Sequence, residues 1–242
     1  MADEVTPAQR TAHQPATVPA ADHGARVRRA VLAGHGGDRA GARVLARDPD
    51  AAVRGAALGA LARLGALSAN DVVGALGDGD AGVRRRACTI AGRMLAAGAP
   101  RGGADGASGT LVGVLVEVLA GDPDWQVVEA AAAALGEMSG PGDGRVVHAL
   151  AAVGATHDEP LCREAAVAAL GALAGGGGVE DPEAALAAVL GALEDRPAVR
   201  RRAAAALAAF DDPRAEAGLR RCLDDRDWQV RQAAEELLDA GG

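Results

Sequence analysis

Arginines in the N-terminal half are the residues whose type and spacing are best suited to recognition chemistry. Arg86 and Arg93 lie seven residues apart and so share one face of a predicted helix, beside Arg85. Arg63 holds, in an earlier copy of the same sequence unit, the position of Arg93. A guanidinium donates paired hydrogen bonds to carboxylates and phosphates, so stacked copies would present a cluster suited to an acidic partner. The alternative is a solvated face balanced by nearby acids, which is how charge runs are usually placed.

Other copies of the unit place tryptophans and acidic residues at the candidate surface. Trp125 and Trp228 stand in identical DWQV strings. Tryptophan is the side chain most enriched at interaction hot spots, but its recurrence within a repeat favours packing against the adjoining helix. The further candidates for partner binding are the charged residues Glu129, Glu137, Glu164, Arg201 and Arg202.

The sequence indicates no catalytic, metal or cofactor site. It has three serines and no GxSxG, HExxH or HxE followed by CxxC. His148 and His157 precede Cys162, but part of this trio lies in a turn and part on an apolar stripe, whereas a metal needs three or four convergent ligands. Neither glycine-rich segment has the GxxxxGK[ST] order that binds phosphate. We therefore expect a non-enzymatic protein.

A repeated unit must position these residues. The stretch Asp48 to Leu64, DPDAAVRGAALGALARL, returns five more times at intervals of roughly 30 to 44 residues, which is typical of stacked helical pairs. Aspartates before the valine and arginine predict helix starts, because their carboxylates accept hydrogen bonds from unpaired amides. Each helix then has one apolar stripe with spacings of three and four, for example Val53, Ala57 and Leu61.

These patterns predict the order of segments along the chain. Residues 1–21, which contain several prolines, are expected to be a disordered tail, followed by a capping helix at 24–34 within a solenoid spanning 22–242. A glycine-rich insertion at 98–109 is expected to be a loop. The six predicted repeats are 38–65, 68–95, 109–139, 143–174, 181–210 and 211–239.

Charge is unevenly distributed along the chain. The formal net charge is -8, yet residues 1–101 carry 14 arginines and 9 acids, whereas residues 102–242 carry 11 arginines and 24 acids. The acidity argues against nonspecific attraction to nucleic acid or to anionic membranes. Three widely spaced cysteines, without a CxxC pair, and the lack of a signal peptide or membrane span favour a cytoplasmic location.

The pattern resembles the HEAT-repeat family, in particular the short bacterial HEAT-like repeats also found in phycobilisome lyases. The resemblance is carried by DPDAAVRGAALGALARLG, DGDAGVRRRACTIAGRM, DPDWQVVEAAAAALGEM and DDRDWQVRQAAEELL, and extends over about residues 38–239. It implies an all-α protein, a right-handed alpha-alpha superhelix of about six repeats, with the second helix of each pair on the concave side. It also implies a ladder of aspartate and arginine between neighbouring repeats, which Val128 would interrupt.

The sequence therefore predicts a scaffold or adaptor that binds a protein partner on its concave surface, through an arginine-rich end and an acidic end. One alternative is a nucleic-acid-binding or repair protein of the HEAT-like alkylpurine glycosylase type, using the arginines on phosphates. Overall acidity and the shortage of aromatic residues weigh against that alternative. A lyase-like or chaperone-like role rests on the resemblance alone. The oligomeric state stays open.

Overall fold

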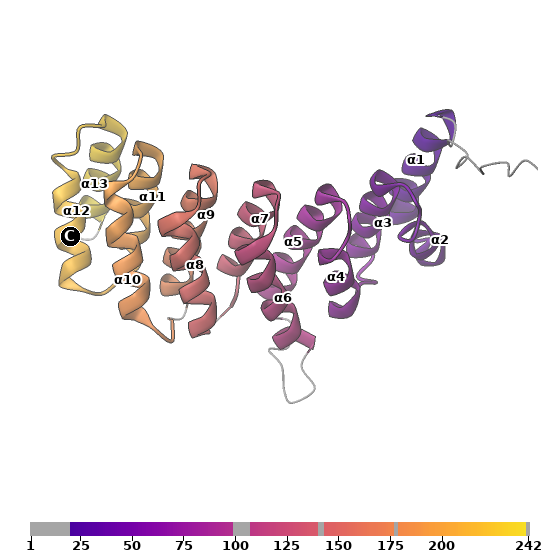
Figure 1. Ribbon diagram of the computed structural model, residues 1–242, viewed down its shortest axis with the longest axis horizontal. Coiled ribbons are helices and arrows are strands. Elements are labelled where there is room, and N and C mark those ends of the chain that lie inside the picture. The colour runs from indigo at the N-terminus through magenta and orange to yellow at the C-terminus, as the bar shows by residue number, and fades with distance from the viewer. Residues whose placement is uncertain (1–19, 99–106, 140–142, 177–178, 241–242) are drawn as a thin grey trace, which may run out of the picture.

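The computed structural model describes residues 20–98, 107–139, 143–176 and 179–240. Within these ranges the chain forms thirteen α-helices and one short 3-10 helix, which confirms the predicted all-α fold. The helices follow one another along the long axis of the molecule, from α1 at one end to α13 at the other (Figure 1). Each pair stacks on the next, so the molecule is a solenoid.

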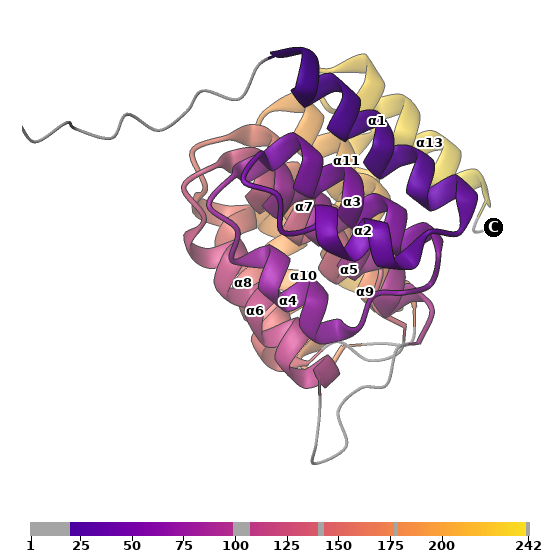
Figure 2. The same ribbon diagram turned by 90° about the vertical axis from the view of Figure 1, so that its right-hand side faces the viewer.

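The helices alternate between two layers, visible along the axis in Figure 2. Neighbouring odd-numbered helices pack against each other along the whole chain and form the inner layer. The inner helices are α1 (Ala20–Gly36), α3 (Ala51–Arg63), α5 (Ala81–Ala96), α7 (Trp125–Gly136), α9 (Pro160–Gly175), α11 (Pro197–Leu207) and α13 (Trp228–Ala240). The outer elements are α2 (Arg39–Leu45), α4 (Ala69–Leu76), α6 (Ala107–Gly121), α8 (Gly144–Thr156), α10 (Pro182–Gly191), η1 (Ala192–Glu194) and α12 (Pro213–Cys222).

Acidic residues cap the starts of α3, α5, α7 and α9, as the sequence predicts, whereas α11 begins after Arg196 without a side-chain cap. The Asp50 carboxylate accepts hydrogen bonds from the amides of Ala52 and Val53, at 2.9 and 3.4 Å. Asp80 caps α5 and Asp124 caps α7 in the same way. These bonds satisfy amides that have no partner within the first turn of the helix. The recurring turn therefore sets where each inner helix begins.

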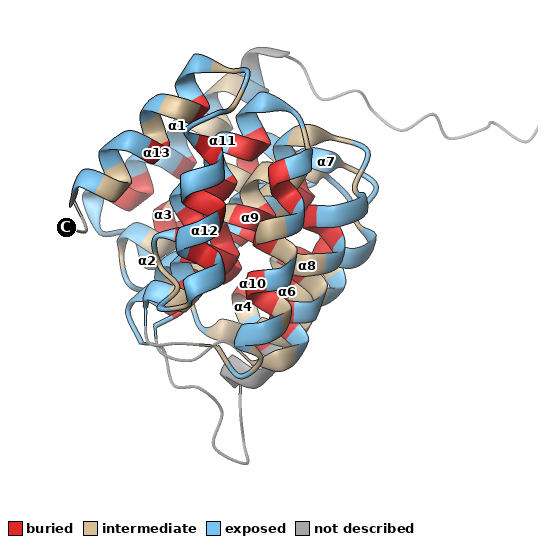
Figure 3. Cartoon of the chain, turned by 90° about the vertical axis from the view of Figure 1, so that its left-hand side faces the viewer, coloured by how far each residue is buried: buried red, intermediate tan, exposed pale blue. Residues whose placement is uncertain are grey.

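The apolar stripe of each inner helix is buried between the two layers. Val53 and Ala57 are fully buried, as are the equivalent Cys162 and Ala166. Figure 3 shows the buried residues running through the interior, with exposed residues on the outside. One connected core extends from Leu58 to Ala234, so stacking supplies the interior that no single pair could enclose.

The first helix differs from the predicted short cap. α1 spans Ala20–Gly36 and packs along α3 in the manner of the other inner helices. Most of the predicted tail and most of the predicted loop at 98–109 lie outside the described residues. Because α1 begins at Ala20 and α6 at Ala107, helices reach into the ends of both segments.

Candidate binding groove

A ladder of ion pairs aligns the inner helices. Arg54 donates from Nε and Nη2 to the two carboxylate oxygens of Asp78, at 2.8 and 2.7 Å, and from Nη1 to the carbonyl of Asp48 at 3.0 Å. The hydrogen bond from Arg54 holds the pKa of Asp78 below its ordinary value. Each such arginine ties its own turn to the turn of the next repeat, so the ladder fixes the stagger between neighbours.

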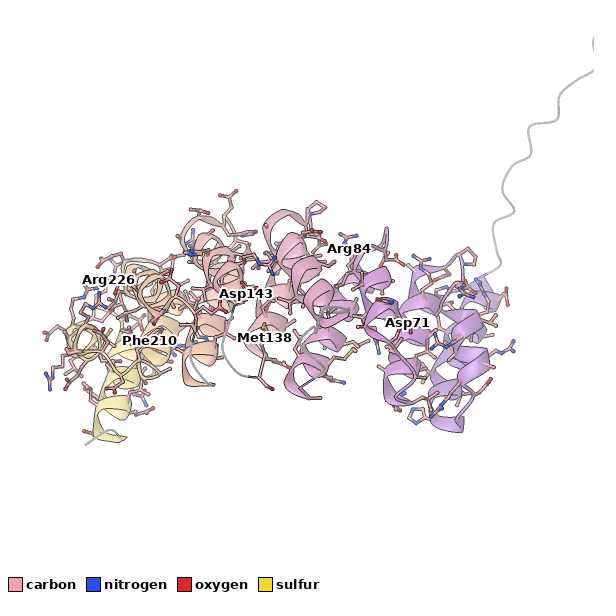
Figure 4. All side chains as sticks on the ribbon, turned by 90° about the horizontal axis from the view of Figure 1, so that it is seen from below. Asp71, Arg84, Met138, Asp143, Phe210 and Arg226 are labelled. Atoms are coloured by element: carbon pink, nitrogen blue, oxygen red, sulfur yellow. The ribbon has the colours of Figure 1, made fainter. Side chains whose placement is uncertain are left out.

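The same paired contact recurs along the solenoid. Arg84, near the middle of the molecule in Figure 4, binds Asp122 at 2.7 and 2.8 Å. Further rungs join Arg163 to Asp195 and Arg200 to Asp225. Arg200 is almost fully buried. The predicted ladder is therefore present.

One rung is replaced on both sides. Val128 stands where the other repeats have arginine, and it is buried. His157 stands where they have aspartate: its Nδ1 accepts from the amide of Glu159 at 3.0 Å, just as Asp122 accepts from Asp124 at 2.9 Å. The Arg163 guanidinium donates to the His157 carbonyl, as Arg54 does to that of Asp48. The sequence analysis identified the valine but missed the histidine, which can be found by aligning the turns.

Glycines allow most inner helices to approach closely. A Cβ built on Gly171 would lie 2.8 Å from the Ala206 Cα on the next helix, and one on Gly136 would lie 2.8 Å from the Ala169 Cα. Gly34 and Gly92 face an alanine of the next helix in the same way. Gly92, Gly136 and Gly171 are each the tenth residue counted from Val83, Val127 and Cys162 as the first, so glycine at this position marks a close crossing.

The crossing of α3 and α5 is the exception nearest the arginines. Ala62 and Ile90 occupy the positions that are glycine and alanine at the close crossings, and these two helices pack less closely than their neighbours do. Arg86 instead crosses to α3, where a Cβ on Gly59 would clash with its guanidinium. The wider crossing and the missing Cβ leave space for arginine side chains on the inner face. Sequence reasoning missed this feature, although the absent glycine signals it.

The four predicted arginines line one depression at this crossing, which we call the basic hollow. Arg63 comes from α3, and Arg85, Arg86 and Arg93 come from α5. The hollow encloses about 820 Å³, a size typical of ligand sites. Arg85 donates to the amide oxygen of Gln126 at 2.7 Å. No carboxylate among the described residues forms an ion pair with any of the four, in contrast to the ladder arginines.

The predicted glutamates line a second depression, the acidic hollow, between α7 and α9. Its walls carry Glu129, Glu137 and Glu164, and its floor is mainly alanine. Arg202 reaches its far side and pairs with Glu164 at 3.4 Å. Glu129 and Ala133 line both depressions, so the basic and acidic hollows are adjacent.

The other predicted residues lie outside these two hollows. Trp125 is 38% exposed and Trp228 is 61% exposed, so each keeps a substantial part of its ring in solvent. Arg201 is exposed and lies 3.4 Å from the amide oxygen of Gln229, repeating the relation of Arg85 to Gln126. The structure thus brings eight of the eleven candidate residues to the hollows: Arg63, Arg85, Arg86, Arg93, Glu129, Glu137, Glu164 and Arg202.

Neither Cys88 nor Cys162, on the inner helices α5 and α9, is activated for covalent chemistry. Burial raises the pKa of the Cys88 thiol to about 12 and that of Cys162 to about 11, so both are protonated at neutral pH. Three or more potential ligands do not converge on a metal position anywhere in the described ranges. Among the described helices, none is long and apolar enough to cross a membrane.

The stacked pairs, the ladder and the grooved inner layer define the class of protein, an α-helical repeat solenoid. The sequence matches the family of HEAT repeats over residues 73–171 and 157–239. The chain belongs to the HEAT-repeat family. No curated protein matches it.

Solved structures share this fold at low sequence identity. An engineered protein matches with 23% identity and a TM-score of 0.59, over 84% of this chain and 97% of its own. A designed armadillo repeat protein, solved in complex with the peptide (KR)4, matches with 16% identity and a TM-score of 0.54, over 90% and 98%. The protein Kap121p matches with 14% identity and a TM-score of 0.64, over 81% of this chain and 22% of its own.

Proposed function

We propose that this protein is a non-enzymatic scaffold that binds an extended segment of a protein partner along its inner layer. The observation that carries the proposal is that two oppositely charged hollows are adjacent and share Glu129 and Ala133. Acidic groups of the partner would bind at Arg86 and Arg93, and basic groups at Glu137 and Glu164. Complementary charge of this kind orients a partner and rejects wrong ones.

The composition of the groove supports a peptide rather than a small substrate. Apart from its charged residues, the groove is lined mainly by alanine and glycine. Such a floor admits a polypeptide backbone at close range, while arginines bind carboxylates in a paired geometry. The related fold of the designed armadillo protein holds a basic peptide, (KR)4, which is the type of segment we assign to the acidic hollow. The three free cysteines support a reducing, cytoplasmic setting.

Selection from a random peptide library, followed by affinity measurement, tests the proposal. Selected peptides should lose affinity about tenfold or more for Arg86→Glu/Arg93→Glu, because the change removes two donors and adds repulsion. The matched control is Arg196→Glu/Arg226→Glu, which alters net charge equally at two exposed arginines outside the groove. It should change affinity less than about twofold. Circular dichroism confirms that both variants are folded.

Two results of this experiment would contradict the proposed function. The proposal is wrong if no peptide is selected, or if selected peptides bind both double variants as tightly as the wild type. Binding of short DNA that weakens steeply with salt, and that is lost in Arg86→Glu/Arg93→Glu, would instead support phosphate recognition by the arginines.

A further inference from the structure

The groove extends beyond the two charged hollows, toward the N-terminal end. A third depression, which we call the apolar hollow, lies over α1, α3 and α5. Most of its lining is apolar, namely Val27, Val31 and small residues of α3, and Asp80 lies at its α5 side. Val31 is 41% exposed although it is a large aliphatic residue. Arg63 and Arg86 line both this hollow and the basic hollow, so the two are adjacent.

The three hollows therefore follow one another along the inner layer in a fixed order. Apolar side chains come first, over α1 and α3. Arginines come next, over α3 and α5, and glutamates follow, over α7 and α9. The ladder holds these helices in one stagger, with Arg54 bound to Asp78 and Arg84 bound to Asp122. Because the order of the three surfaces is fixed, the groove should select a ligand whose side chains have the complementary order.

We propose that the groove recognises a three-part peptide motif in which an acidic side chain lies between an apolar side chain and a basic one. This inference rests on the proposed function and adds the order of the partner's side chains. The apolar side chain would pack on Val27 and Val31, the acidic one would bind Arg86 and Arg93, and the basic one would bind Glu137 and Glu164.

Helix spacing sets the distances between the three positions. Packed helices lie about 8–10 Å apart, and an extended peptide rises about 3.3 Å per residue, so one inner helix corresponds to about three residues. Along the solenoid, the basic hollow lies one inner helix beyond the apolar hollow, and the acidic hollow lies one to two inner helices beyond the basic hollow. In the motif the acidic position therefore lies about three positions from the apolar one, and the basic position lies about three to six positions from the acidic one.

Four synthetic peptides of identical composition test the order. Each carries one leucine, one glutamate and one arginine in an alanine and serine background. Two peptides have glutamate in the middle. One has the order leucine, glutamate, arginine from its N-terminus, and the other has the reverse order. Two others have the orders acidic, apolar, basic and apolar, basic, acidic. We expect one peptide with a central glutamate to bind at least about tenfold more tightly than both of the others, because only that order satisfies all three hollows.

A charge-exchange variant provides the reciprocal test. Arg86→Glu/Arg93→Glu/Glu137→Arg/Glu164→Arg keeps the net charge of the protein and inverts the order of its two charged hollows. It should prefer the peptide with the order apolar, basic, acidic. Val31→Asp, at a half-exposed position, should remove the preference for leucine and leave the preference for the order of the charges. This single substitution provides a second measurement if the quadruple variant does not fold.

The outcomes separate this inference from the proposed function. Equal affinity for all four peptides, with loss of binding in Arg86→Glu/Arg93→Glu, overturns the ordered motif and leaves the peptide groove in place. No binding by any of the four peptides, or by library peptides, overturns both. A preference for a central glutamate that inverts in the charge-exchange variant supports the motif.

Discussion

Val128 and His157 replace, on both sides, the arginine and aspartate that form the other rungs of the ladder. His157 preserves the turn, because its Nδ1 accepts a hydrogen bond from the amide of Glu159. Val128 is buried, and an arginine in its place would have no carboxylate to pair with. The two replacements are physically consistent with each other, because a buried guanidinium that lacks its partner is costly. The altered rung joins α7 to α9, where the acidic hollow lies.

Restoring this rung should require both residues. We expect Val128→Arg alone to destabilise the fold by about 2 kcal/mol or more, since it buries an unpaired charge. Val128→Arg/His157→Asp should recover most of that loss, with a coupling energy of about 1–3 kcal/mol in a double-mutant cycle measured by urea unfolding. Additive effects of the two substitutions would contradict the assignment of these positions as a rung.

The ladder itself should contribute strongly where it is buried. Arg200→Ala removes the paired contact with Asp225 and the bond to the Asp195 carbonyl. We expect a loss of about 3 kcal/mol in the free energy of unfolding, because the aspartate keeps a partly buried charge without its partner. Arg226→Ala, at an exposed arginine of the next turn, should change stability by less than about 0.5 kcal/mol. Similar losses in both variants would argue against the ladder.

Acid should weaken the ladder. The Arg54 hydrogen bond lowers the pKa of Asp78 from its ordinary value of 3.8, and Arg163 and Arg200 act likewise on Asp195 and Asp225. Folding therefore favours the ionised carboxylates. Their contribution is fully present above that ordinary value and is lost as the pH falls through the lower pKa of the folded state.

We expect stability in urea to decline below about pH 4 and expect Asp78→Asn to flatten part of that decline. The control is Asp224→Asn, at an exposed aspartate outside the ladder. A decline that is equally steep in wild type and Asp78→Asn would show that this rung does not titrate as proposed.

Close helix crossings should depend on glycine. A methyl group on Gly171 would lie 2.7 Å from the Ala206 Cβ, so Gly171→Ala must push α9 and α11 apart. We expect a loss of about 1–3 kcal/mol. Gly113→Ala is the matched control, because no atom lies within 4 Å of the added methyl group on α6, and alanine should stabilise that helix by about 0.5–1 kcal/mol. Thermal unfolding should show a lower melting temperature than that of the wild type for Gly171→Ala and a higher one for Gly113→Ala.

Much of the fold was predictable from local signals. Aspartates before Val53 and Val83 marked helix starts, and spacings of three and four marked the buried stripe, because capping and amphipathicity act within a few residues. α1 was predicted as a short cap rather than an inner helix. Its place in the inner layer depends on packing against α3, which local sequence signals do not show.

The convergence of Arg63 with Arg85, Arg86 and Arg93 was also predictable, because a repeat places equivalent positions above one another. The sequence by itself thus determined the repeating helical pairs, their charges and which residues share a face. Only the tertiary structure decided that the basic and acidic faces join through Glu129, and that the basic hollow opens at the crossing of α3 and α5. Those features depend on how closely the helices approach each other. The volume of the side chains at a crossing, such as Ala62 and Ile90, sets that distance. Packing between residues that are distant in the sequence leaves no periodic pattern from which it could be predicted.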